Sequence, residues 1–261
     1  MNSNSNLSPM DDIANMFSVD DYMYFYSDYL SPERSDAETQ AVVNLLEMNQ
    51  PMRVLDLACG FGRIANRLAL LGYRVTGVEY QPGFLEIARA AAEAMEILEV
   101  RRGGSARYIQ GDMRQIEFSA QFERAIMMFN SFGYFSDAEN LEVLKRIGQA
   151  LVPGGRLGFD IGSRDGLMAN FHPHYVSEKD GNLMINRFSF DVQSGRLRNE
   201  RIVIRDGVRK DRPFSIRLYS VSEMRGLLAE AGFTLEQVYG EWDARPLEQA
   251  SGAMVVIARK I

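Results

Sequence analysis

Cysteine, histidine and long apolar runs are all scarce in this chain of 261 residues. Cys59 is the sole cysteine, so no internal disulfide can form, which fits a reducing compartment. No apolar run approaches the roughly 20 residues that a membrane-spanning helix needs. The two histidines, His172 and His174, come with no HExxH or CxxC pattern, so we expect no metal site.

Positive charge is also in short supply. Lysine and arginine total 29 against 35 acidic residues, a net charge of −6. Non-specific binding to nucleic acid depends on a positive surface, so we expect no nucleic-acid partner. Residues 1–12 are polar and rich in Asn and Ser, without the basic start and apolar core of a secretory signal. We therefore expect a soluble cytoplasmic protein with no membrane partner.

Apolar strands alternate with helical patterns through most of the chain, which predicts an α/β fold with a mainly parallel sheet. Apolar residues make up 46% of the sequence, enough for a buried core. We expect an aromatic helix within 20–30 and further helices over 36–48, 62–71, 82–98, 137–151 (capped by Asp137) and 222–231. The expected strands are 53–57, 73–79, 107–110, 122–129, 156–161, 234–239 and 253–258, with a tight turn at 153–155.

Between Tyr175 and Tyr219 the apolar pattern changes to a period of two, typical of antiparallel strands. Turn signals at Asp180-Gly181, Ser194-Gly195 and Asp206-Gly207 predict hairpins. We place Met184, Phe188, Phe190 and Val192 on one face of a strand. The expected organisation is an N-terminal tail with capping helices (1–50), a ligand-binding domain (51–163 plus 220–261) and an inserted β-meander (164–219).

A glycine-rich turn follows the first strand, where Gly60-Phe61-Gly62 leads directly into a helix. Strand, glycine turn and helix present a nucleotide-like ligand at the carboxyl edge of an α/β sheet. Glu79 ends the second strand about 20 residues later, where an acid can accept ribose hydroxyls. Asp56, inside the first strand, and Asp112, after the third, are unusual for a dehydrogenase that binds NAD.

These motifs resemble the class I S-adenosylmethionine-dependent methyltransferases. Family-like segments are Asp56–Arg63, Val75–Glu79, Asp112–Arg114, Asn130–Tyr134 and Leu151–Gly155. Glu79 stands where many relatives have aspartate, a change compatible with the same ribose contact. The resemblance covers residues 20–260 and implies a Rossmann-like sheet of seven strands, the seventh antiparallel, with helices on both faces.

The resemblance also implies S-adenosylmethionine as cofactor, and a methyl group passed to an O or N atom of a small-molecule acceptor. Asp112 would accept from the adenine amino group while Met113 packs on the ring, although Asp112 could instead cap a turn. Asp56 either supports the cofactor or organises the loop through backbone contacts. The expected cofactor-binding residues are Tyr29, Arg34, Asp56, Ala58, Gly60, Gly62, Arg63, Glu79, Tyr80, Gln81, Asp112, Met113, Phe129 and Asn130.

The candidates for a general base are His172, His174 and Tyr134, since the histidines leave the fifth strand toward the expected site. The alternative is that both histidines lie in a surface loop without a catalytic role. We expect Cys59 to be a small buried packing residue and not a nucleophile. The meander carries eight basic and three acidic residues between 196 and 217, which fits an exposed face, an acidic substrate or a homodimer interface. The rival functions are an NAD-dependent oxidoreductase and a non-catalytic ligand-binding protein on the same fold.

Overall fold

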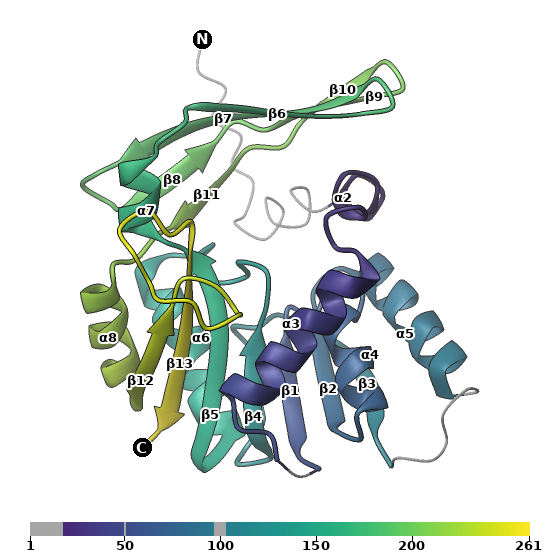
Figure 1. Cartoon of the computed structure of the whole chain (residues 1–261), viewed down its shortest axis with the longest axis vertical. Coiled ribbons are helices and arrows are strands. Elements are labelled where there is room, and N and C mark those ends of the chain that lie inside the picture. Colours follow the sequence, from purple (N-terminus) through teal and green to yellow (C-terminus); the bar gives the residue numbers. More distant parts are fainter. Residues whose placement is uncertain (1–17, 50, 97–102) are drawn as a thin grey trace. The chain divides into compact units, whose positions relative to one another are not determined.

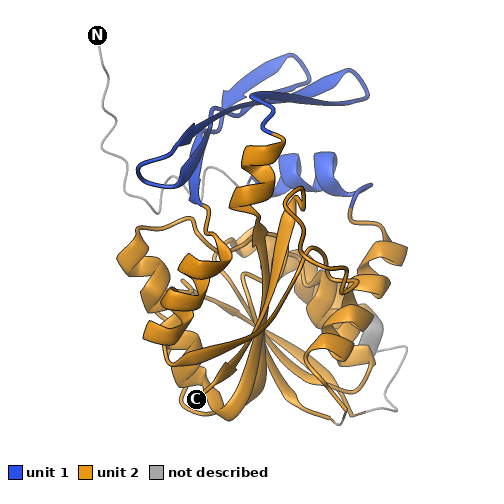
Figure 2. Ribbon diagram, turned by 60° about the vertical axis from the view of Figure 1, so that its left-hand side comes forward, with its two compact units in different colours: residues 1–29, 171–217 blue, residues 30–170, 218–261 orange. Residues whose placement is uncertain are grey.

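A computed structural model describes residues 18–49, 51–96 and 103–261. The chain divides into two compact units, coloured separately in Figure 2. One unit comprises residues 1–29, of which 18–29 are described, together with 171–217. The other comprises 30–170 and 218–261. No helix in the described part of the chain is long and apolar enough to cross a membrane.

The larger unit is built on a seven-stranded sheet, shown in Figure 1. Its order is β12-β13-β5-β4-β1-β2-β3, and β13 runs antiparallel to both of its neighbours while the other six strands all run in one direction. This confirms the predicted Rossmann-like α/β sheet with an antiparallel seventh strand. The strands are β1 (Arg53–Leu57), β2 (Arg74–Glu79), β3 (Ser105–Gln110), β4 (Phe122–Met127), β5 (Leu151–Gly162), β12 (Phe233–Tyr239) and β13 (Ala253–Lys260).

Two groups of helices flank this sheet, with α3, α4 and α5 in one and α6 and α8 in the other (Figure 1). A capping box starts α6, because Ser136 and Glu139 satisfy each other's backbone N–H groups. The predicted cap Asp137 is therefore wrong by one residue, since Asp137 already lies in the first turn. The helices are α3 (Pro32–Leu45), α4 (Arg63–Leu70), α5 (Pro82–Glu96), α6 (Asp137–Ala150), α7 (Arg164–Ala169) and α8 (Val221–Glu230).

One cluster of the hydrophobic core lies between the first helix group and the sheet centre. Val54 and Ile126 from the sheet are fully buried, as are Leu46, next to α3, and Leu68 of α4. The apolar positions of α4 fall three and four residues apart, so one face of the helix covers β2 and β3. This packing fixes where the turn between β1 and α4 sits.

Two predicted boundaries in this unit differ from the structure. α3 begins at Pro32 rather than residue 36, because the Ser31 hydroxyl accepts from the Arg34 amide and proline suits a first helical position. The turn predicted at 153–155 lies inside β5 as an irregularity, where Gly154 has a φ of +73° and the register with β4 shifts.

The smaller unit contains the predicted antiparallel meander. Asp180-Gly181 and Asp206-Gly207 have positive φ at both residues, which is what a two-residue hairpin turn needs. Met184 is buried, but Val192 lies beyond its strand and is 79% exposed, so it does not share that face. The strands are β6 (His174–Lys179), β7 (Asn182–Asp191), β8 (Arg196–Asn199), β9 (Ile202–Arg205), β10 (Val208–Asp211) and β11 (Phe214–Arg217).

The aromatic helix predicted within 20–30 is α2 (Val19–Tyr26), and it packs on this meander. The Tyr24 hydroxyl donates to the Lys179 carbonyl at 2.8 Å, and Arg205 approaches Asp21 at 3.4 Å. Residues up to 29 therefore belong with the meander, which begins at residue 171. The sequence instead predicts an N-terminal segment of residues 1–50 and a meander that begins at residue 164. The predicted polar tail (1–12) and the last two residues of the helix predicted over 82–98 lie outside the described residues.

Candidate active site

The backbone at the carboxyl edge of the sheet adopts conformations that L-residues avoid. Ala58, Gly60 and Gly62 follow β1 with φ of 56°, 54° and 76°, and Phe129 and Asn130 follow β4 with 64° and 58°. Positive φ at non-glycine residues outside simple turns costs free energy and is enriched at functional sites. Two loops of this sheet edge are therefore held in shape at a cost to stability.

Glu79 connects the end of β2 to the glycine turn. One carboxylate oxygen accepts from the Gly60 amide at 2.9 Å, and the other accepts from the Gln81 amide at 2.9 Å. The residue is 8% exposed; burial raises its pKa, while hydrogen bonds from the backbone oppose that rise. The turn and the acid are thus fixed relative to each other before any ligand arrives.

The β-carbon that Gly60 lacks would point into open space. Among the described atoms, none lies within 4 Å of that position. At Gly62 the opposite holds, since a β-carbon would stand 2.5 Å from the Tyr108 hydroxyl and 2.9 Å from the Ala88 β-carbon. Gly62 is therefore required by packing, whereas Gly60 leaves the turn accessible from outside.

Asp56 and Cys59 are buried beside this turn. Burial raises the pKa of Asp56 to about 8, Arg63 opposes that rise, and Glu79 adds to it. Burial also raises the pKa of the Cys59 thiol well above its ordinary value, with further contributions from Asp56 and Glu79. This burial favours the protonated thiol over the nucleophilic thiolate.

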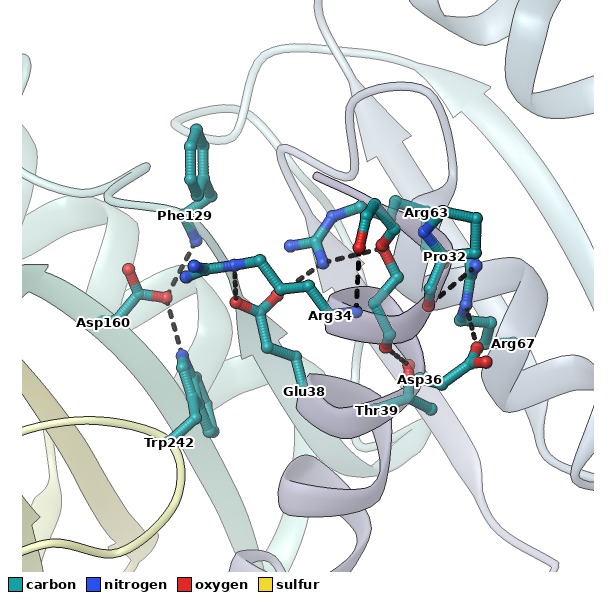
Figure 3. A network of polar contacts seen from close by, with 12 residues as sticks. Pro32, Arg34, Asp36, Glu38, Thr39, Arg63, Arg67, Phe129, Asp160 and Trp242 are labelled. Atoms are coloured by element: carbon teal, nitrogen blue, oxygen red, sulfur yellow. Dashed lines mark hydrogen bonds and ion pairs between the residues drawn. The ribbon is translucent and has the colours of Figure 1, made fainter. Parts of the chain in front are cut away.

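A network of charged side chains lies where α3 meets the start of α4 (Figure 3). The buried Glu38 carboxylate pairs with Arg34 at 2.8 Å and also with Arg63, whose guanidinium donates to the Ser35 hydroxyl at 3.3 Å. One carboxylate thus orients two arginines, and the three side chains carry a net charge of +1. A guanidinium held in this way is suited to bind a carboxylate.

Asp112 and Arg114 form a second pair after β3. The Arg114 guanidinium donates to Asp112 at 2.8 Å and to Glu139 at 2.5 Å, and lies 4.3 Å from the centre of the Phe135 ring. Asp112 also accepts from the Arg114 amide at 2.9 Å, so it organises its own turn. The adjacent Met113 is half-buried.

The loop after β4 is held by a carboxylate that the sequence analysis missed. Asp160 of β5 accepts from the Phe129 amide at 2.8 Å and from the Trp242 indole at 3.0 Å, as Figure 3 shows. It also accepts from the Asn130 amide at 2.8 Å. Burial raises the pKa of Asp160, and these three donors oppose that rise. Asp160 is the only acid in the apolar stretch 157–161, a signal as visible as Asp56 in β1.

The structure therefore gathers most of the predicted cofactor residues at one edge of the larger unit. Tyr80 and Gln81 directly follow β2 there, and Tyr134 is half-buried in the loop after β4. Tyr29, which is 52% exposed, and the exposed His172 and His174 belong to the smaller unit. Glu38 and Trp242 were missed, and only Trp242, the single tryptophan, stood out in the sequence. Among the described residues, no group of three or more His, Cys, Asp or Glu could hold a metal ion.

Comparisons with known proteins concern the family and the fold of this chain. Residues 54–155 match a family model described as a methyltransferase domain. YqeM of Bacillus subtilis is 28% identical over 215 residues, which cover 76% of this chain and 80% of YqeM. YqeM is itself named only as a proposed methyltransferase.

Solved structures share the fold over nearly the whole chain. The CcbJ methyltransferase from Streptomyces caelestis superposes with a TM-score of 0.79 at 20% identity, covering 96% of this chain and 99% of CcbJ. CalS10 from Micromonospora echinaspora, an amino pentose methyltransferase solved with S-adenosylmethionine bound, gives a TM-score of 0.62 at 17% identity, covering 88% and 91%. At these identities the likeness concerns the fold.

Proposed function

We propose that this chain, which belongs to the class I S-adenosylmethionine-dependent methyltransferases, methylates an oxygen or nitrogen atom of a small-molecule acceptor. The observation that carries the proposal is the sheet edge, where an open glycine turn, the buried Glu79 and the rigid loop after β4 come together. The matches to methyltransferases argue against the two rival functions, an NAD-dependent oxidoreductase and a non-catalytic binding protein.

The residues of this edge fit the cofactor. Gly60 leaves space over the turn, and Glu79 lies beside it with lone pairs suited to ribose hydroxyls. The arginines on Glu38 suit the carboxylate of the amino-acid portion, and Met113 suits an adenine ring. Asp112 is engaged by Arg114, so its predicted contact with the adenine amino group would have to share the carboxylate.

S-Adenosylmethionine supplies a methyl group on a sulfonium, which becomes a neutral thioether as an acceptor lone pair bonds the methyl carbon and the acceptor loses a proton. Because the methyl group is already activated, this chain needs no nucleophile of its own, in keeping with the protonated Cys59. Its residues contribute by aligning the reactants and excluding water. Asp160 serves alignment by fixing the loop after β4.

Three features support a small acceptor. The net charge of −6 disfavours nucleic acid. CalS10, which shares the fold, is named as acting on an amino pentose. A cavity of about 540 Å³ lies in the same unit, within the size range of small-molecule pockets.

Calorimetric titration with S-adenosylhomocysteine, with NADH as the parallel ligand, tests the proposal. We expect micromolar affinity for the first and no binding of the second. Transfer of labelled methyl groups to a panel of small alcohols and amines, with RNA and DNA included, then tests the acceptor class. Methylation of nucleic acid alone, or failure to bind S-adenosylhomocysteine, would overturn the proposal.

We propose that the general base is one of three residues: His172, His174 or Tyr134. We expect His172→Ala and His174→Ala to bind S-adenosylhomocysteine within about twofold of wild type, because both are exposed residues outside the unit that carries Glu79. Loss of turnover in one variant, restored at higher pH, would identify the base. Loss in neither would leave Tyr134, tested as Tyr134→Phe.

A further inference from the structure

The cavity of about 540 Å³ lies at the carboxyl end of β5, away from the glycine turn. Three segments that are distant in the sequence line it: residues 163–169 with α7, residues 219–221 at the start of α8, and residues 247–254 before β13. The mechanism described above uses none of them. All three belong to the larger unit.

The walls of the cavity are firmly built. A β-carbon at Gly166 would stand 1.8 Å from the Ser251 carbonyl oxygen, so only glycine lets α7 approach this loop. The Ser163 amide donates to the Gly252 carbonyl at 3.1 Å, and the Ser251 hydroxyl accepts from the Glu248 amide at 2.9 Å. These contacts hold the backbone of two of the cavity walls close together.

The cavity adjoins the loop after β4. Asn130 accepts from the Gly162 amide at 2.9 Å, one residue before Ser163 of the cavity wall. Phe132 packs against Tyr219, another wall residue, with 5.9 Å between ring centres. A ligand in this cavity would thus touch the same rigid frame that shapes the edge near β4.

The cavity carries negative charge. Asp165 and Glu248 line it, and none of the lining residues in the described chain is basic. Arg164 lies 3.5 Å from Asp165 but also binds Glu223 at 2.6 Å, so one cation is shared by two acids. The start of α8 offers no anion site, because Ser220 and Glu223 form a capping box. The remaining walls combine apolar residues with hydroxyl and amide groups, as in pockets for small polar ligands.

Building on the proposed function, we propose that this cavity binds the methyl acceptor and that the acceptor is a small hydroxylated molecule bearing a protonated amino group. The ammonium lies against Asp165 and Glu248, and the apolar walls contact its carbon skeleton. A nitrogen held protonated has no lone pair with which to attack a methyl carbon. The ammonium is therefore a recognition group, and another atom of the acceptor is methylated.

Three sugars with the same ring but different charge test which charge this cavity prefers: glucosamine is cationic, glucose is neutral and glucuronate is anionic. Each is titrated, by calorimetry and ligand-observed NMR, into protein saturated with S-adenosylhomocysteine. We expect glucosamine to bind at least tenfold more tightly than glucose, and glucuronate to bind most weakly. Equal binding of all three, a preference for glucuronate, or no binding at millimolar concentration would overturn the inference. Failure to bind S-adenosylhomocysteine would instead count against the proposed function.

Two charge-removing variants locate the binding. Asp165→Asn and Glu248→Gln should each weaken glucosamine binding about three- to tenfold and leave S-adenosylhomocysteine affinity unchanged. Glu86→Gln, on the exposed surface of α5, is the matched control and should change neither. If glucosamine binds equally to wild type and both cavity variants, its site lies elsewhere and the assignment is wrong.

Discussion

The two ends of the sheet's carboxyl edge satisfy their charges in different ways. Near β1 and β2, Glu79 is bonded to backbone amides, and Glu38 holds two arginines. Near β5, Asp165 and Glu248 line a cavity, and Asp165 shares Arg164 with Glu223. We propose that the first end binds the cofactor and that the second end leaves its two carboxylates for the methyl acceptor. One fold can in this way keep its cofactor and vary its acceptor.

Substitution of a packing glycine at each end should have the largest effect. At Gly62 (φ 76°) an alanine β-carbon would collide with Tyr108, and at Gly166 it would collide with the Ser251 carbonyl oxygen. We expect Gly62→Ala and Gly166→Ala each to lower the free energy of unfolding by at least about 2 kcal/mol in urea denaturation. Of the variants that still fold, only Gly62→Ala should also weaken S-adenosylhomocysteine binding.

Gly226 is the matched control for both substitutions. It lies within α8, and among the described atoms none is within 4 Å of its missing β-carbon. Gly226→Ala should raise the free energy of unfolding by about 0.5–1 kcal/mol, since alanine is the better helix former. Wild-type stability of Gly62→Ala would contradict the packing that sets the first end apart.

Removal of Glu79 tests the first end directly. Glu79→Ala deletes the carboxylate that is bonded to the turn and proposed to receive the ribose. The affinity for S-adenosylhomocysteine should fall by roughly 1–3 kcal/mol, about 5- to 150-fold, the range for hydrogen bonds to a charged group. Glu248→Ala, at the other end, should leave it unchanged. Unchanged affinity of Glu79→Ala would remove this residue from the site.

The two ends also differ in how far the sequence predicted them. The strand, glycine turn and helix around Gly60, and the hairpins at Asp180-Gly181 and Asp206-Gly207, depend on residues close together in the chain. Such local determinants are readable without a structure. The Ser136 capping box is equally local, because Ser136 and Glu139 stand three residues apart, although the sequence-based prediction placed the cap at Asp137.

What the sequence could not show depends on distant contacts. Asp160 and Trp242 are 82 residues apart, and Glu38 meets Arg63 across 25 residues. The cavity near β5 draws on three segments spread over about ninety residues, none with a motif of its own. Side chains that meet only through tertiary packing leave no periodic pattern, so the cavity near β5 became visible only in the structure.

The buried acid of β1 predicts a pH-dependent stability for the first end. Asp56 has an ordinary pKa of 3.8 and a folded-state pKa of about 8, so the folded protein binds its proton more tightly. Its contribution to stability is complete below about pH 4 and is lost as the pH rises toward 8. The cost of Asp56→Asn in unfolding free energy should therefore be smaller at pH 8.5 than at pH 5, by at least about 1 kcal/mol.

Urea denaturation of both proteins at the two pH values measures this difference. Asp36→Asn controls for the loss of one negative charge, because Asp36 lies on an exposed surface with its side chain 71% accessible. A cost of Asp56→Asn that does not change with pH would show that Asp56 is ionised in the folded protein, despite its burial.

The smallest effect should come from Arg34, the more exposed of the two arginines that pair with Glu38. Arg34, 36% exposed, is proposed to meet the carboxylate of the cofactor's amino-acid portion. Arg34→Gln should weaken S-adenosylhomocysteine binding about fivefold, roughly 1 kcal/mol, since a partly exposed ion pair contributes little more. The affinity for 5′-methylthioadenosine, which lacks that carboxylate, should stay the same. Arg67→Gln is the control, because Arg67 pairs with Asp36 on the surface instead. Equal losses for both ligands would mean that Arg34 acts through the fold of α3, and the charges of this end would then be arranged for stability rather than for a ligand.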